Sequence, residues 1–134
     1  MAYTPFKASV VTPEKTILDG EITIAVLPAD DGYLGVLNRH APLVAKLKPG
    51  ILKLDVVGKG EERFVISGGY AQMKDNALAI LTDDALAASE ATGELAAEEL
   101  AKAEALPGET ESQARRRQTA IARAAAIQAI ASGN

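Results

Sequence analysis

Residues 21–42 read EITIAVLPADDGYLGVLNRHAP, and they say most about how this chain folds. Apolar side chains alternate with others over 21–27, which predicts a β-strand with one apolar face. Pro28 is expected to end this strand, because proline has no backbone N–H to give to a sheet. Gly32 and Gly35 then bracket a short apolar segment. Since no nucleophile stands beside a base here, we interpret the part after Pro28 as a contact surface.

Short β-type runs recur through the first two thirds of the chain. Residues 74–76, Lys-Asp-Asn, predict a hairpin turn, since Asp and Asn tolerate tight backbone conformations. Strands spaced roughly ten residues apart predict an antiparallel β-sandwich or barrel. The runs that carry this prediction, besides 21–27, are residues 51–57, 64–66 and 78–81.

The composition changes near residue 88, beyond which β-branched residues become rare and alanine dominates. We expect one helix from Thr92 to Leu106, stopped by Pro107–Gly108. A second helix is expected from Thr110 to Ala131. Gln113 stands three residues after Thr110, as a capping box requires.

The expected organisation is a β-sandwich domain over residues 1–88, followed by an antiparallel two-helix hairpin over residues 89–134. Both helices have mainly small apolar faces. Because alanine buries little area, and burial yields roughly 25 cal/mol per Å², such a hairpin is held to its neighbours by little free energy. A movable regulatory arm and a stable helical cap both remain open. The expected faces are Leu95, Ala96, Leu100, Ala103 and Leu106 on the first helix, and Ala120, Ala124, Ile127 and Ala131, flanked by Ile121 and Ile130, on the second.

Charge is divided between the two predicted helices. Residues 89–109 hold six Glu against one Lys, whereas residues 110–134 hold one Glu against four Arg. One interpretation is a hairpin braced by ion pairs, although exposed pairs contribute only about 0–1 kcal/mol each. The other rests on Arg115, Arg116 and Arg117. Because consecutive helical residues point about 100° apart, at least one of them must point away from the first helix, available to an acidic partner.

The totals bound the class of protein. At 134 residues the chain is one domain, or one small domain with an appendage. A net charge of −4 argues against nucleic-acid binding, which needs a basic face. The absence of Cys excludes disulfides and thiolate metal sites. We see no secretory signal or transit peptide at the N-terminus, and no apolar run of about 18 residues that would span a membrane.

Candidate catalytic and ligand-binding residues are few. His40 is adjacent to the cationic Arg39, and its nearest carboxylates in sequence are Asp30 and Asp31, so a structural or interface role is favoured over catalysis. The two aspartates lack the rest of a metal-ligand set, which favours a solvated turn. The glycines open no helix with Lys-Ser or Lys-Thr behind them, and therefore indicate bulges or turns, not a phosphate loop. We expect no catalytic residue, no cofactor and no metal.

Several short motifs, in their order and spacing, resemble the epsilon subunit of the F-type rotary ATP synthase, bacterial type. The matching stretches are Asp31–Val36, His40–Leu43, Lys48–Gly50, Ser67–Gly69 and Leu81–Ala85. The resemblance covers the whole chain, and it implies a flattened β-sandwich of about ten strands followed by two helices.

The resemblance implies a non-catalytic subunit of the central stalk, or rotor, which couples proton translocation to ATP synthesis. The partners it implies are the gamma subunit, the c-ring of the membrane sector and the alpha/beta catalytic head. It implies no nucleic acid and no direct membrane insertion, and a peripheral place at the cytoplasmic face of the bacterial inner membrane. The hairpin would extend into the catalytic head and hinder ATP hydrolysis.

The resemblance also carries three contact sites to numbered residues. The c-ring contact falls on Asp30, Asp31, Gly32, Tyr33 and Leu34. The gamma contact falls on His40, Ala41, Pro42 and Leu43. The beta-subunit contact of the inhibitory hairpin falls on Arg115, Arg116, Arg117 and Arg123.

The chain departs from the family pattern at two places. Tyr33 stands where the c-ring turn often carries an acidic residue. Some bacterial relatives bind ATP through Ile/Leu-Asp-x-x-Arg-Ala at the start of the first helix. Here the Asp and Arg positions hold Gly93 and Ala96, so we expect no tight ATP site. The alternative function is a free-standing β-sandwich ligand-binding module with a helical dimerisation hairpin, which self-association through the hairpin would favour.

Overall fold

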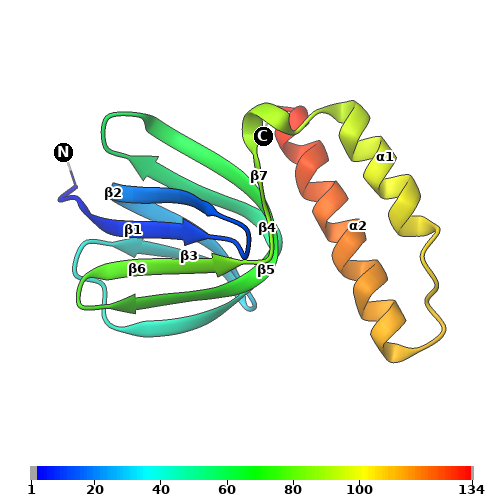
Figure 1. The fold of residues 1–134 in the computed structure, drawn as a ribbon, viewed down its shortest axis with the longest axis horizontal. Helices are drawn as coiled ribbons and strands as arrows, with labels where there is room; N and C mark the ends of the chain where they lie inside the picture. The colour runs from blue at the N-terminus through cyan, green and yellow to red at the C-terminus, as the bar shows by residue number, and fades with distance from the viewer. Residues whose placement is uncertain (1–2, 134) are drawn as a thin grey trace.

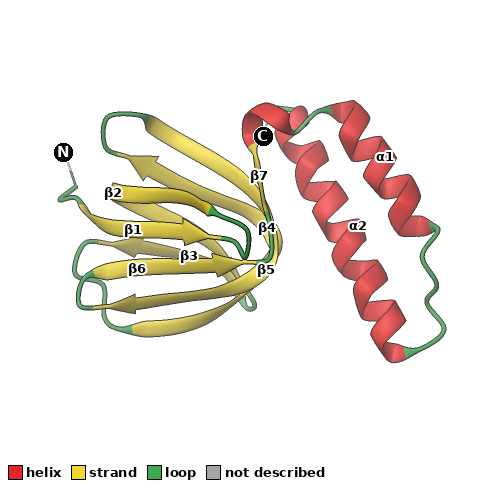
Figure 2. Ribbon diagram, in the orientation of Figure 1, coloured by secondary structure: helices red, strands yellow, loops and turns green. Residues whose placement is uncertain are grey.

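The computed structural model describes residues 3–133 and has two parts, a β-sandwich and a two-helix hairpin beside it (Figures 1 and 2). Met1 and Ala2, at the start of the predicted sandwich domain, and Asn134, at the end of the predicted hairpin, lie outside the described residues. The predicted β + α architecture is confirmed.

Seven strands build the described sandwich, fewer than the ten that the resemblance implies. The reason is length: β2, β4 and β5 are 14, 14 and 15 residues long, and each pairs with more than one neighbour. The predicted runs 21–27, 51–57 and 64–66 overlap these long strands. The strands are β1 (Phe6–Val11), β2 (Thr16–Ala29), β3 (Gly32–Leu37), β4 (Leu43–Val56), β5 (Gly60–Lys74), β6 (Ala77–Thr82) and β7 (Ala85–Ala87).

The strand order is β1-β6-β5-β4-β2-β3, with β7 paired to β5 off this path, and an additional pairing joins β1, at one end, to β2, the neighbour of β3 at the other end. All pairings are antiparallel except β1–β6, which is parallel. The expectation of a wholly antiparallel sandwich is therefore wrong at this one pair. A parallel pair needs a long connection, and here the intervening strands supply it.

Two local predictions about β2 and the β5–β6 turn have different outcomes. Asp75 and Asn76 have φ of 52° and 58°, as a two-residue hairpin turn requires, so that prediction is confirmed. The expectation that Pro28 ends its strand is wrong, because β2 continues to Ala29. The register against β4 shifts between Val26 and Ala29, which lets proline enter the strand without breaking a regular ladder.

Gly68 and Gly69 lie where β5 exchanges one neighbour for another. Residues 64–66 of β5 pair with β7, whereas residues 69–74 pair with β6. The two glycines have φ of 119° and 142°, and a Cβ on Gly69 would overlap the backbone carbonyl oxygen of Leu81. Only glycine combines this backbone conformation with so close an approach. The register of β5 against β4 is the same on both sides of the pair, so the glycines serve a positive-φ, close-approach position and not the expected bulge or tight turn.

The buried apolar side chains form two separate clusters. The main cluster lies inside the sandwich, while the satellite cluster lies between the sandwich and the hairpin. The main cluster comprises Phe6, Ala8, Val10, Ile22, Ala25, Leu27, Val36, Leu47, Leu52, Leu54, Val56, Phe64, Ile66, Ala71, Met73, Leu78 and Ile80. The satellite cluster comprises Val65, Ala91, Ala96, Ala126, Ile127 and Ile130. Since burying one Val or Ile contributes about 1.5–3 kcal/mol, the hairpin is docked far more weakly than the sandwich is packed.

The chain reaches the hairpin through a short 3-10 turn, η1 (Ala88–Glu90), and then forms α1 (Gly93–Glu104) and α2 (Glu111–Ala131). Thr92 caps α1, which ends two residues before the predicted Leu106. Thr110 and Gln113 form the predicted capping box of α2. In Figure 1, α2 lies between α1 and the sandwich, against β4 and β5.

The residues of the predicted apolar faces are buried or half-buried, with two exceptions. Leu100 is 39% exposed, and Ala131, at the very end of α2, is exposed. Ala126 was not expected on the face, yet it is buried. Because α2 contacts α1 on one side and the sheet on another, it buries a wider face than a single stripe predicts.

Candidate functional site

The predicted c-ring contact is the exposed turn between β2 and β3. Asp30 and Asp31 are exposed, and Gly32 takes a φ of 130°. Tyr33 is 62% exposed, while Leu34 is half-buried against the main cluster. The backbone N–H of Asp30 donates to the Lys46 carbonyl at 3.1 Å, which ties the turn to β4. The turn thus exposes an aromatic ring and two carboxylates to solvent, while its backbone is hydrogen-bonded to β4.

The predicted gamma contact, His40–Leu43, is the loop between β3 and β4. The Arg39 backbone N–H donates to Asn76 Oδ1 at 2.7 Å, and Asn76 Nδ2 donates to Asn38 Oδ1 at 2.9 Å. These bonds hold the start of the loop against the β5–β6 turn. His40 Nδ1 lies 2.8 Å from the Ala41 carbonyl oxygen, and among residues 3–133 no carboxylate pairs with its ring. The loop is a positioned surface with no catalytic arrangement.

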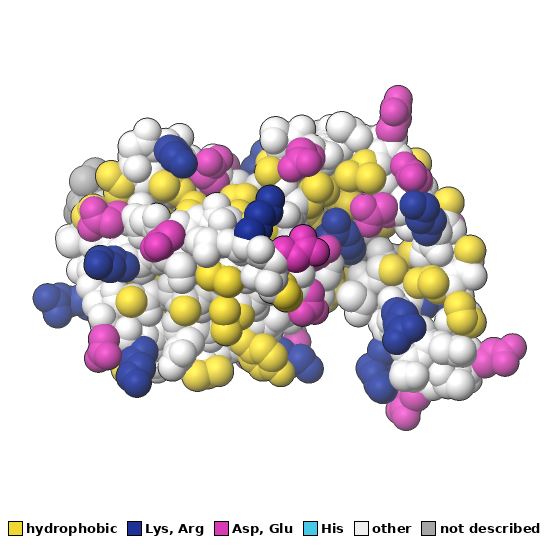
Figure 3. Space-filling view, in the orientation of Figure 1, with side chains coloured by type: hydrophobic (Ala, Val, Ile, Leu, Met, Phe, Trp, Pro, Cys, Tyr) yellow, Lys and Arg dark blue, Asp and Glu magenta, His cyan; other side chains and the backbone are white. Residues whose placement is uncertain are grey.

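An apolar strip begins where this loop ends. We use the name exposed strip for Val44, Tyr70 and Leu81, which are 73%, 55% and 56% exposed. Lys46 pairs with Tyr70, and Tyr70 pairs with Leu81. The side chains of Lys46, Tyr70 and Leu81 therefore lie in one row across three strands, on the outer face. Val44 is two residues before Lys46 and shares that face. On the face drawn in Figure 3, hydrophobic side chains gather over this part of the sandwich.

A groove of about 670 Å³ runs along one side of the strip. Its lining includes Tyr70 and Leu81 of the strip, Lys46 and Lys48 of β4, and Thr119 of α2. A partner protein bound to the strip at this edge would therefore also contact α2. A second hollow is lined by the turn residues 29–34 together with residues 43–46 of β4, so the predicted c-ring and gamma contacts are neighbours.

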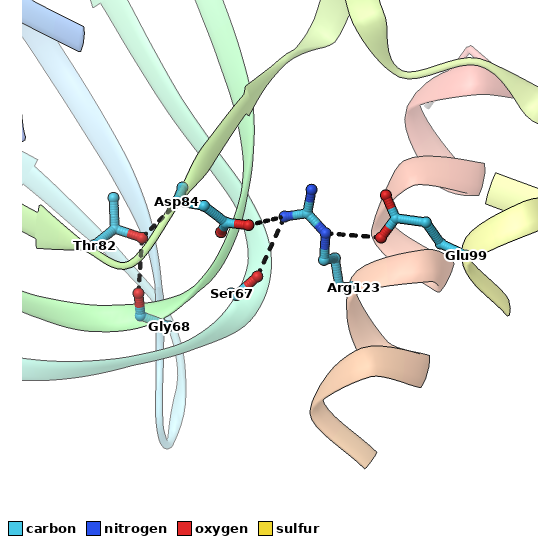
Figure 4. Close-up of polar contacts among 6 residues, drawn as sticks. All are labelled: Ser67, Gly68, Thr82, Asp84, Glu99 and Arg123. Carbon is cyan, nitrogen blue, oxygen red and sulfur yellow. Dashed lines mark hydrogen bonds and ion pairs between the residues drawn. The ribbon is translucent and has the colours of Figure 1, made fainter. Parts of the chain in front are cut away.

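Arg123 lies in a different environment from the other three predicted beta-subunit contacts. Its side chain is only 17% exposed and forms ion pairs with Asp84 Oδ2 at 2.8 Å and Glu99 Oε1 at 2.9 Å (Figure 4). Its Nη1 also donates to Ser67 Oγ at 3.2 Å. In this conformation Arg123 joins α2 to both the sandwich and α1, and it does not face an outside partner.

The arginines near the start of α2 remain at the surface. Arg115 and Arg116 are exposed, and neither forms an ion pair within residues 3–133. Arg117 is half-buried and reaches the Glu104 carbonyl at 3.5 Å. Figure 3 shows basic side chains at the hairpin tip, away from the sandwich. Of the two interpretations of the divided charge, ion-pair bracing therefore holds for Arg123, whereas Arg115 and Arg116 are exposed without an ion pair in the described part of the chain.

The described residues offer no site for a metal ion and no membrane-spanning helix. No group of three or more His, Asp or Glu side chains within residues 3–133 is arranged to hold a metal ion. Gly93 is the first residue of α1, and Ala96 is buried in the satellite cluster. The absence of a tight ATP site stays a prediction. None of the described helices is both long enough and apolar enough to cross a membrane.

Comparison with known families decides what kind of protein carries these surfaces. Residues 5–88 match the family model described as "ATP synthase, Delta/Epsilon chain, beta-sandwich domain". The chain belongs to this ATP synthase family. An ATP synthase epsilon chain of Leptospira interrogans is 40% identical over 109 residues, which is 80% of this chain and 84% of that relative. The predicted function, an epsilon-type subunit of the ATP synthase without catalysis of its own, is thereby confirmed.

Solved ATP synthase structures contain chains of the same fold. One, in the Euglena gracilis mitochondrial enzyme, superposes with a TM-score of 0.80 at 25% identity, covering 96% of this chain and 82% of that one. Another, in the Tetrahymena thermophila mitochondrial enzyme, gives a TM-score of 0.75 at 16% identity over 98% and 99% of the two chains, and shows the fold alone. Sandwich and hairpin thus occur together in these solved structures.

Sequence reasoning missed two groups of residues in this epsilon-family chain. The exposed strip was not expected, because outward and inward positions of a strand look alike when both are apolar. The Arg123 partners Asp84, Glu99 and Ser67 were not expected either. Asp84 and Ser67 belong to the quoted stretches Leu81–Ala85 and Ser67–Gly69, which was the one signal available.

Proposed function

We propose that this chain is a central-stalk subunit that turns with the rotor and couples proton translocation to ATP synthesis. The observation that carries the proposal is the exposed strip, continuous with the loop His40–Leu43. Three large apolar side chains left in solvent on one face, around Lys46, support a contact surface for another protein. The loop and the strip together form the proposed gamma-binding face.

The c-ring is the proposed partner of the turn Asp30–Leu34. The turn is exposed at its tip and braced to β4 at its base. It shares a hollow with the first residues of β4, next to the proposed gamma face. A subunit that bridges gamma and the c-ring needs two contact sites close together, and this arrangement supplies them. The similar Euglena chain comes from a structure of the OSCP, F1 and c-ring parts of the mitochondrial ATP synthase.

The hairpin, residues 89–134, is proposed as a separable inhibitory arm on a body formed by residues 1–88. Its small satellite cluster supports release at modest cost. Arg115 and Arg116 offer unpaired positive charge to an acidic segment of the beta subunit in the alpha/beta head, with Arg117 beside them. We place the subunit peripherally, at the cytoplasmic face of the bacterial inner membrane.

The experiment is to mix the full chain with isolated gamma subunit and measure masses by light scattering during gel filtration. We expect a one-to-one complex with gamma, because the strip is a ready apolar surface. The chain alone is expected to run as a monomer. A dimer that forms through the hairpin and does not bind gamma would contradict the proposal. It would favour the free-standing β-sandwich ligand-binding module.

A further inference from the structure

We infer that Arg123 is a clamp that sets how readily the hairpin leaves the sandwich, and that it acts in the opposite sense to Arg115 and Arg116. The clamp itself stands on the contacts of the folded chain. Its consequence for enzyme activity rests on the proposed function of the hairpin as an inhibitory arm.

The clamp joins three parts of the fold at one guanidinium. Asp84 lies between β6 and β7 on the sandwich, and Glu99 lies on α1, while Arg123 itself belongs to α2. Its Nε donates to Glu99 and its Nη1 donates to Asp84 and Ser67. A planar guanidinium satisfies such separated acceptors, which a lysine ammonium on a flexible stem does poorly. Moving α2 off the sandwich breaks both contacts to the sandwich together.

Asp84 is held in place to receive Arg123. The Thr82 hydroxyl lies 2.8 Å from the carbonyl oxygens of both Asp84 and Gly68, so its hydrogen ties the β6–β7 connection to the glycine pair of β5 (Figure 4). Asp84 Oδ1 is buried and has no hydrogen-bond partner among the described residues. Arg123 is the charged partner of Oδ2, while the Asp84 side chain as a whole remains 47% exposed, so loss of Arg123 removes a docking contact without leaving a fully buried charge.

The clamp is a large part of what docks the hairpin. The apolar contribution comes from the satellite cluster, whose buried members larger than alanine are Val65, Ile127 and Ile130, with the partly buried Ile51, Leu86 and Leu95 packed around them. Arg123 lies one helical turn before Ile127, at the edge of that cluster. Charge-assisted hydrogen bonds in a partly buried site are about twice as strong as neutral ones. Loss of Arg123 should therefore shift the docking equilibrium strongly while the main cluster stays intact.

Arg116 provides the matched control on the same helix. It carries the same charge seven positions earlier, yet it is exposed and forms no ion pair within residues 3–133. Neutralising Arg123 removes a docking contact, whereas neutralising Arg116 removes only surface charge. In an inhibited enzyme, neutralising Arg123 should strengthen inhibition, because the hairpin is released more readily. Neutralising Arg116 should weaken inhibition.

The test is hydrogen exchange of the isolated full-length chain, read by mass spectrometry for α2 and for β4–β5 separately. Arg123→Gln is expected to speed exchange in α2 by about tenfold, since local opening governs exchange, with β4–β5 unchanged. Arg116→Gln should leave both regions unchanged. Arg123→Lys keeps the positive charge but loses the planar guanidinium, so its α2 exchange rate should lie between those of the parent chain and Arg123→Gln. If α2 exchange in both Arg123 variants matches the parent chain, the apolar contacts alone dock the hairpin and the clamp is overturned.

Hydrolysis by the assembled enzyme separates a failure of the clamp from a failure of the inhibitory role. Faster α2 exchange in Arg123→Gln with unchanged ATP hydrolysis keeps the clamp and contradicts the inhibitory arm. Faster exchange with lower hydrolysis, and higher hydrolysis in Arg116→Gln, supports both. Faster exchange with hydrolysis raised equally by both variants contradicts the opposite-sense assignment, because Arg123 would then serve the acidic target too.

Discussion

Removing residues 89–134 from the subunit is expected to raise ATP hydrolysis by the assembled enzyme several-fold, with assembly and ATP synthesis largely retained. The hairpin carries none of the main cluster, so the sandwich should keep its fold and its partners. Its own docking depends on the small satellite cluster and one clamp, so the arm can leave its resting place. Hydrolysis and synthesis rates of reconstituted enzyme, measured with and without the hairpin, check this result.

The control for that deletion is the stability of the remaining sandwich. Deletion exposes Val65 together with Ile51 and Leu86, which pack beneath the hairpin, so some loss of stability is expected. Thermal unfolding of the shortened subunit should still be cooperative. If the shortened subunit folds and assembles but hydrolysis is unchanged, the hairpin is a stable helical cap and not an inhibitor.

The double substitution Tyr70→Asp and Leu81→Asp is expected to weaken gamma binding at least about 100-fold. The two side chains are paired neighbours on the outer face, and each is more than half exposed, so the fold should tolerate the change. A partner that covers them would have to bury two unpaired carboxylates, which costs about 1–3 kcal/mol or more per group. Calorimetric titration of gamma into the folded variant measures the loss.

Val57→Asp is the matched control for this surface. Val57 is 49% exposed and lies outside the strip. It directly follows the last residue of β4, whereas Val44 is near the first residue of that strand. The control should bind gamma as the parent chain does. Equal affinity of parent, control and double variant would place gamma elsewhere on the sandwich.

The helical hairpin could be predicted closely, because its signals are local. Thr110 and Gln113 are three residues apart, and the structure forms the expected capping box. Helix period, caps and the Pro107–Gly108 stop act within a few residues. The buried Ala126 was missed because two neighbours, and not one, cover α2.

The sandwich was predicted in class but not in detail, since its register depends on distant segments. Gly68–Gly69 resembles the end of a strand, yet β5 continues through it to Lys74 while its neighbour changes. Pro28 likewise resembles a terminator, but a register shift accommodates it within β2. The parallel pairing of β1 with β6 joins segments too far apart for any local pattern to indicate.

The ion-pair partners and the exposed strip could not be predicted either, because they also depend on residues distant in sequence. Arg123 is one of four arginines on one helix, and nothing near it in sequence distinguishes it. Its hydrogen-bond partners Glu99 and Ser67 are 24 and 56 positions away. The exposed strip also required three-dimensional neighbours, because Tyr70 and Leu81 come from different strands. Family motifs indicated loops that stay predicted contacts, and the structure added what lies beside them.

The central claim is that gamma covers the loop His40–Leu43 and the strip that follows it. Because the chain contains no Cys, a single cysteine can be placed on this surface without interference. Val44→Cys, carrying a short photoactivated cross-linker in the assembled enzyme, is predicted to link to gamma in high yield, while Val57→Cys is predicted to give little gamma product. Efficient cross-linking to gamma from position 57 and none from position 44 would contradict the account.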